Sequence, residues 1–128
     1  MAGQRSAEKL KRLVLAQSVS ESLARSQVGE YLAEVNKLER QLSQARDAFT
    51  SNETTAVFSD LHLSHIYSLT NRCEQAKQRL EGAQRELQHE SLRNKKLQSK
   101  LRLSQSHEQR EEEQKMLLER LDQFSTRA

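Results

Sequence analysis

Apolar residues recur along residues 28–49 in steps that alternate between three and four positions. This spacing is typical of a helix that buries one narrow seam against another helix. The residues between the seam positions are mostly charged or polar, so the remaining faces are expected to contact water. Because isolated helices depend on packing for most of their stability, the segment needs a partner helix. The seam positions are Val28, Tyr31, Val35, Leu38, Leu42, Ala45 and Phe49.

A second seam begins at Ile66 and keeps the same rhythm as far as Leu101, with a polar interruption at Glu90 and Asn94. An Asn that is buried in such a seam fixes the register of the two helices and lowers stability. An Asn that is exposed in a fraying seam has no such role, and the sequence leaves both alternatives open. Beyond Leu101 the frame positions are polar, so we expect the seam to end there. The chain from about Ser106 is then expected to continue as an unpaired helix.

Residues 50–55 separate the two seams and are rich in Ser, Thr and Asn, which favour turns and caps over helix interiors. If the chain folds there, the numbers of facing residues add up to about 110–113, as a short connection between antiparallel helices requires. Leu10 then lies near Leu101, where the second seam ends. The sequence thus predicts an all-α fold, a two-helix antiparallel coiled-coil hairpin with a longer C-terminal helix. We expect one domain over residues 1–128, with helices at about 6–49 and 58–125 and a turn at about 50–57.

The composition supports long helices. The 128-residue chain contains no proline and only three glycines, so few residues interrupt a helix. Charged residues make up 30% of the chain and aromatic residues 4%, which suits a thin rod better than a layered core. The sustained heptads argue against the disorder that so polar a composition could otherwise indicate. No apolar run approaches the length of a membrane span, and we expect a cytoplasmic protein without a signal peptide.

Few residues offer catalytic or metal-binding chemistry. His62 and His65 share one helix face near Asp60, but no third ligand is placed by the sequence, so we expect no metal. Cys73 lies in the second seam, where it is expected to act as a small apolar residue rather than a nucleophile. A thin rod has no concave cavity, so we predict that the protein is not an enzyme and holds no cofactor.

The charges and the last apolar cluster suggest interaction with a partner. A basic run at residues 9–12 lies level with another at residues 93–102, and an acidic run follows at residues 111–113. These runs indicate either electrostatic docking onto an acidic partner or an ordinary solvated surface. The net charge of +3 gives no general affinity for nucleic acid. The amphipathic cluster at residues 116–124 has no seam partner, and it folds back, self-associates or inserts into another protein; we favour insertion.

Three stretches of the chain carry a resemblance to a known family: Leu10-Lys11-x-Leu13, Leu92-Arg93-x-Lys95-Lys96-Leu97 and Leu121-Asp122-x-Phe124-x-x-Arg127-Ala128. In these stretches the chain resembles the FliJ/YscO family, the stalk proteins of the flagellar and injectisome type III export apparatus. The resemblance implies a stalk without enzymatic activity that couples an ATPase to protein secretion. Its helix ends enter a hexameric export ATPase, and its hairpin tip touches the cytoplasmic domain of the export gate at the inner membrane. Some family members also bind export chaperones.

The resemblance assigns two groups of site residues. The ATPase-binding residues are Leu10, Lys11, Leu117, Leu121, Asp122, Phe124 and Arg127. The gate-binding residues are Leu42, Ala45, Phe49, Leu63 and Tyr67, and Ala45 stands where the family often has an aromatic residue. The alternative function is a generic coiled-coil scaffold or tether that forms a homodimer. A nucleic-acid binder that uses the basic end is disfavoured, because that end lacks aromatic residues for base stacking.

Overall fold

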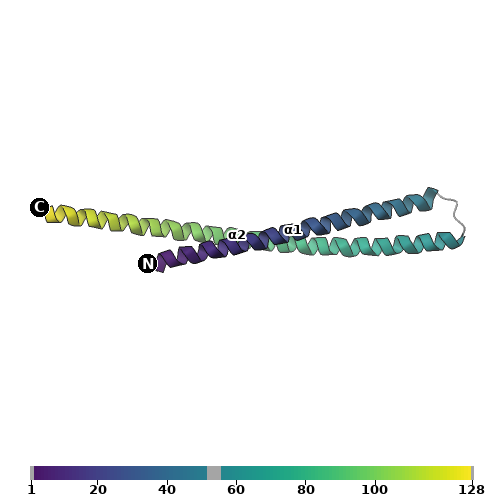
Figure 1. The fold of residues 1–128 in the computed structure, drawn as a ribbon, viewed down its shortest axis with the longest axis horizontal. Coiled ribbons are helices and arrows are strands. Elements are labelled where there is room, and N and C mark those ends of the chain that lie inside the picture. Colours follow the sequence, from purple (N-terminus) through teal and green to yellow (C-terminus); the bar gives the residue numbers. More distant parts are fainter. Residues whose placement is uncertain (1, 52–55, 128) are drawn as a thin grey trace. The chain divides into compact units, whose positions relative to one another are not determined.

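The chain forms two long helices that pack against each other. The computed structural model describes residues 2–51 and 56–127, and their side chains over residues 6–50 and 59–126. Helix α1 (Ala2–Ser51) contains 50 residues and α2 (Ala56–Arg127) contains 72 residues (Figure 1). The prediction of an all-α helical hairpin with a longer second helix is therefore confirmed.

Contacts between the helices group the chain into two units. Unit 1 combines the part of α1 up to Glu21 with the part of α2 from Glu90 onward. Unit 2 comprises Ser22–His89, which contains the rest of both helices. Each unit is a pair of helix segments from opposite halves of the chain.

Both helices extend further toward the connection than the sequence predicted. The turn was expected at about residues 50–57, but α1 continues through Ser51 and α2 begins at Ala56. The Thr50 hydroxyl donates hydrogen bonds to the carbonyl oxygens of Arg46 and Asp47, at 3.2 and 3.1 Å. Because this back-bonding lets a Thr remain helical, Thr50 prolongs α1 rather than ending it. Residues 52–55, the centre of the predicted turn, lie outside the described residues.

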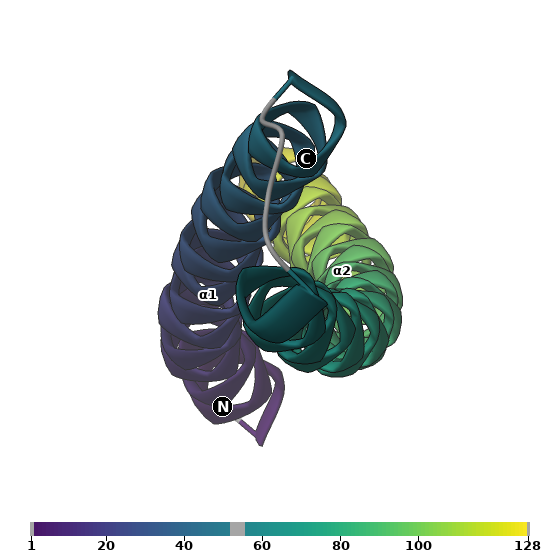
Figure 2. The ribbon, with the colours of Figure 1, turned by 90° about the vertical axis from the view of Figure 1, so that its right-hand side faces the viewer.

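Unit 2 has a thin but continuous seam at the predicted positions. Its core cluster consists of Leu42, Leu69 and Cys73, with Leu38, Ala45 and Ile66 packed against it. Viewed from the end of the hairpin, the two helices lie side by side (Figure 2). Ion pairs cross the seam between Lys77 and Glu39 (3.2 Å) and between Arg79 and Glu34 (3.8 Å). These contacts match the predicted antiparallel register.

The seam of unit 1 reaches further along both helices than the sequence predicted. Ala7 is only 5% exposed, and on α2 the frame positions Ser104 and Glu108 are half-buried beyond Leu101. The expectation that the seam ends at Leu101 was therefore wrong. The small Ala7 lets the helices stay together, and polar side chains at frame positions are then covered by the neighbouring helix. From residue 109 to residue 126 every described side chain is exposed, which agrees with an unpaired end of α2.

Candidate docking surfaces

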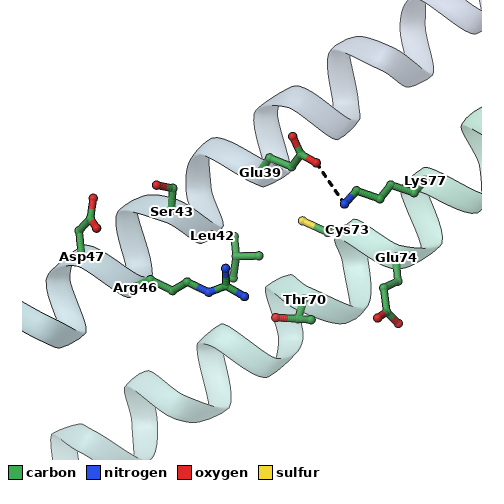
Figure 3. A pocket seen from close by; sticks show the side chains of 9 residues that line it. All are labelled: Glu39, Leu42, Ser43, Arg46, Asp47, Thr70, Cys73, Glu74 and Lys77. Carbon is green, nitrogen blue, oxygen red and sulfur yellow. Dashed lines mark ion pairs between the residues drawn. The ribbon is translucent and has the colours of Figure 1, made fainter.

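The buried face of unit 2 is where its two helix segments pack against each other. Cys73 is 4% exposed and packs in the core cluster, as the sequence predicted. A shallow groove of about 420 Å³ runs beside it, and Figure 3 shows Cys73 and Leu42 extending into the space between the helices. The ion pair between Glu39 and Lys77 crosses the same groove. Within the described residues, no three His, Cys, Asp or Glu side chains gather in a way that could hold a metal ion.

The two histidines of α2 differ in their surroundings. The ring of His62 is half-buried and lies edge-on to Phe49, with ring centroids 6.5 Å apart and an interplanar angle of 65°. His65 is exposed. Edge-to-face packing of this kind stabilises the contact between helices, so His62 has a structural role near the end of unit 2.

The predicted gate-binding residues are mostly covered by the hairpin's own packing. Leu42 is 9% exposed in the core cluster, and Ala45 packs against that cluster. Phe49 and Leu63 are half-buried, whereas Tyr67 is 67% exposed. Of these five side chains, Tyr67 offers the most surface to a partner.

A polar layer interrupts the seam of unit 1; it consists of Gln17, Glu21, Glu90 and Asn94. The Gln17 amide donates hydrogen bonds to the backbone carbonyl of Glu90 (3.1 Å) and to its carboxylate. The Asn94 amide donates to the Glu21 carboxylate at 2.6 Å. Asn94 is 8% exposed, so of the two alternatives that the sequence left open, an Asn buried in the seam is the correct one. These donors and acceptors meet only in one register, and the layer therefore specifies how the helices align.

The surface of unit 1 beside this layer is strongly basic. Both predicted basic runs belong to this unit, and their Lys and Arg side chains are exposed. Within the described part of the chain, the only ion pair of these cations joins Arg93 to Glu90 at 3.8 Å. The exposed cations are Lys9, Lys11, Arg12, Arg93, Lys95, Lys96, Lys100 and Arg102.

The end of α2 carries an apolar face without a covering helix. Leu117, Leu121 and Phe124 are 58%, 62% and 74% exposed. In unit 1 this end of α2, yellow in Figure 1, runs past the first residues of α1. Met116 and Leu118 are exposed beside it. Such side chains are the usual anchors of a helix that docks into a groove.

The remaining predicted ATPase-binding residues lie on both helices of unit 1. Leu10 is half-buried in the seam, and Lys11 is exposed beside it. Asp122 is exposed, and its backbone carbonyl accepts a hydrogen bond from the Thr126 hydroxyl at 3.0 Å. The Arg127 side chain lies outside the described residues.

The sequence did not lead us to expect two exposed leucines on α2. Leu92 is 55% exposed and Leu103 is 72% exposed. Both stand outside the three-four frame of the second seam, on the side of α2 turned away from α1. The position of these two leucines outside the three-four frame was therefore a sequence signal for apolar residues on the exposed side of α2.

Over the described residues, neither helix has a stretch of the length and hydropathy needed to cross a membrane. Comparisons with family models, with curated proteins and with solved structures each gave no match. The function is therefore inferred from the surfaces of this chain alone.

Proposed function

We propose that this protein is a stalk component of a type III export apparatus. In this role it performs no chemistry. It docks its helix ends into a hexameric export ATPase and its hairpin tip on the cytoplasmic domain of the export gate, at the cytoplasmic face of the inner membrane. The observation that carries the proposal is the unpaired end of α2, where Leu117, Leu121 and Phe124 are all more than half exposed.

The exposed end of α2 has the properties of a docking helix. Burying a large apolar side chain contributes about 1.5–3 kcal/mol, so three such residues on one face supply a substantial part of a binding free energy. A helix that projects beyond its own partner can enter a narrow opening that a globular domain cannot. This geometry suits insertion into the centre of a ring.

The basic surface of unit 1 complements this apolar face. Lys9, Lys11 and Arg12 on α1 are exposed close to where the unpaired end of α2 begins. Charge of one sign around an apolar anchor raises the association rate and orients the partner more than it raises affinity. The proposed partner surface is therefore acidic around an apolar opening.

The proposal is tested with the export ATPase of the same system. We expect the wild-type chain to bind the ATPase and to raise its hydrolysis rate. Leu121→Asp places a charge in the docking face and is expected to weaken binding at least about tenfold, as loss of a central apolar anchor does. Leu23→Asp is the matched control, because Leu23 is 67% exposed but lies in unit 2.

Circular dichroism should show that both variants remain helical. An equal loss of ATPase binding with both variants would contradict the stalk proposal. The absence of binding by the wild-type chain would contradict it as well. Retained binding by Leu23→Asp alone would support it.

A further inference from the structure

Helix α2 carries two successive segments of opposite charge in unit 1. The basic segment, residues 91–107, contains five Lys or Arg and no Asp or Glu. The acidic segment, residues 108–122, contains six Asp or Glu and three Lys or Arg. A parallel copy in register would place like charges together. An antiparallel copy would place each segment against its opposite.

Three exposed leucines stand on one side of α2, and polar residues interrupt that side. The polar residues between them are Lys96, Ser99, Ser106, Arg110 and Gln114. Leu92 and Leu103 are separated by about three helical turns, and Leu103 and Leu121 by about five, so all three share one side of the helix. This back face of α2 is turned away from α1, because Leu92 stands midway between the inward positions Glu90 and Asn94. Its three leucines are 55%, 72% and 62% exposed.

We propose that a second copy of this chain docks antiparallel along the back face of α2. When Leu92 faces Leu121 of the second copy, opposite charges meet on both flanks. In antiparallel helix pairs the same flank of each helix meets its counterpart. Lys100 then lies against Glu111 of the second copy on one flank. Arg102 lies against Glu113 of the second copy on the other flank.

Two observations favour a second copy as the occupant. The basic segment of each copy faces the acidic segment of the other copy. A two-fold axis therefore repeats every contact, and the assembly closes as a dimer. In addition, Lys100 and Arg102 are exposed and have no ion pair within the described part of the chain. The Glu111 carboxylate lies 3.0 Å from the Nε2 atom of His107 on its own helix.

This dimer goes beyond the proposed function and does not depend on it. The back face contains Leu117 and Leu121, which are also proposed to enter the ATPase. Dimerisation and ATPase docking would therefore exclude each other. Only the role of the dimer rests on the stalk proposal: there it is a resting form that protects the apolar end of α2 from nonspecific contacts.

The arrangement also contains unfavourable contacts, and one of them sharpens the test. Arg110 lies opposite Leu103 of the second copy, so a charged side chain meets an apolar one. In the same register Lys95 lies against Arg120 of the second copy, and two like charges meet. Lys95→Glu would turn this contact into an attractive one. If apolar contact alone held the two copies together, a charge reversal in the basic segment would not strengthen their association.

The experiment is sedimentation equilibrium of the full chain at low and at high salt. We expect a monomer–dimer equilibrium that weakens with salt, because exposed ion pairs are screened. Arg102→Glu should weaken dimerisation about tenfold, since two symmetric pairs become repulsive. The double variant Arg102→Glu/Glu113→Arg should restore it, and Lys95→Glu should strengthen it several-fold.

Arg72→Glu is the matched control, because it makes the same charge change on an exposed position of α2 in unit 2. It should leave the equilibrium unchanged. A wild-type chain that stays monomeric at low salt would overturn the proposal, as would a double variant that fails to restore dimerisation. Since the experiment uses this chain alone, its result is separate from that of the ATPase assay.

Discussion

Single side chains in the seam contribute unequally to the free energy of unfolding, because most buried positions among the described residues hold small residues. Ala24, Ala76 and Ala83 are 6%, 2% and 8% exposed, and each buries little apolar area. Leu69 is 2% exposed and fills the centre of the core cluster with Leu42. A thin seam of this kind concentrates apolar stabilisation in a few large side chains.

Leu69→Ala should therefore lower the free energy of unfolding by about 2–5 kcal/mol, as truncation of a buried Leu does. Leu15→Ala is the control, because Leu15 is 69% exposed, and its effect should stay within about 0.5 kcal/mol. Urea unfolding followed by circular dichroism measures both. Equal effects of the two substitutions would mean that unit 2 is not held by the core cluster.

At the scale of the helices, α2 has a packed part and an unpacked part. Its seam reaches Glu108, and its described side chains from residue 109 onward are exposed. The packed part is stabilised by α1, whereas a solitary helix of this length is only marginally stable in water. The end of α2 is therefore available for partners without loss of the hairpin.

Truncation after Arg110 should leave the hairpin folded. We expect the free energy of unfolding to change by no more than about 0.5 kcal/mol, because every described side chain in the removed segment is exposed. Under the stalk proposal the shortened chain should no longer stimulate the export ATPase. A large loss of stability would show that the removed segment packs on the hairpin in solution.

For the molecule as a whole, the polar layer of unit 1 decides how the two helices align. Apolar seams alone tolerate a shift by one heptad, because each layer resembles the next. The hydrogen bonds from Gln17 to Glu90 and from Asn94 to Glu21 are lost in a shifted register. The layer thus favours one alignment over the alternatives.

Asn94→Leu should make the chain about 1 kcal/mol more stable, because an apolar side chain replaces a partly unsatisfied amide in the seam. The Asn94 Oδ1 atom has no hydrogen-bond partner among the described residues. The variant should also populate more than one register. A second set of NMR amide signals for Gly29 and Gly82 would report the added register.

Gln98→Leu is the control, because Gln98 is half-buried beside the seam of α2 and lies outside the polar layer. It should keep a single set of signals. A destabilised Asn94→Leu variant with one set of signals would contradict the role given to the layer.

Much of this architecture follows from the order of the residues. The three-four spacing around Val35 and Leu42 and around Leu69 and Ala76 specifies which side of each helix is buried, and the structure buries those positions. The spacing is sufficient because helical geometry alone determines which residues share a face. The Ser/Thr-rich stretch between the seams also located the connection to within a few residues.

Only the tertiary structure decided what the polar frame positions do. Asn94 is buried and bonded because Glu21 lies on the facing helix, and Ser104 and Glu108 are covered because α1 extends as far as Ala7. The burial of a polar side chain depends on the neighbour brought to it by folding, and periodicity within one helix does not contain that information. The exposure of Leu92 and Leu103 was decided in the same way, by which side of α2 is left without a partner.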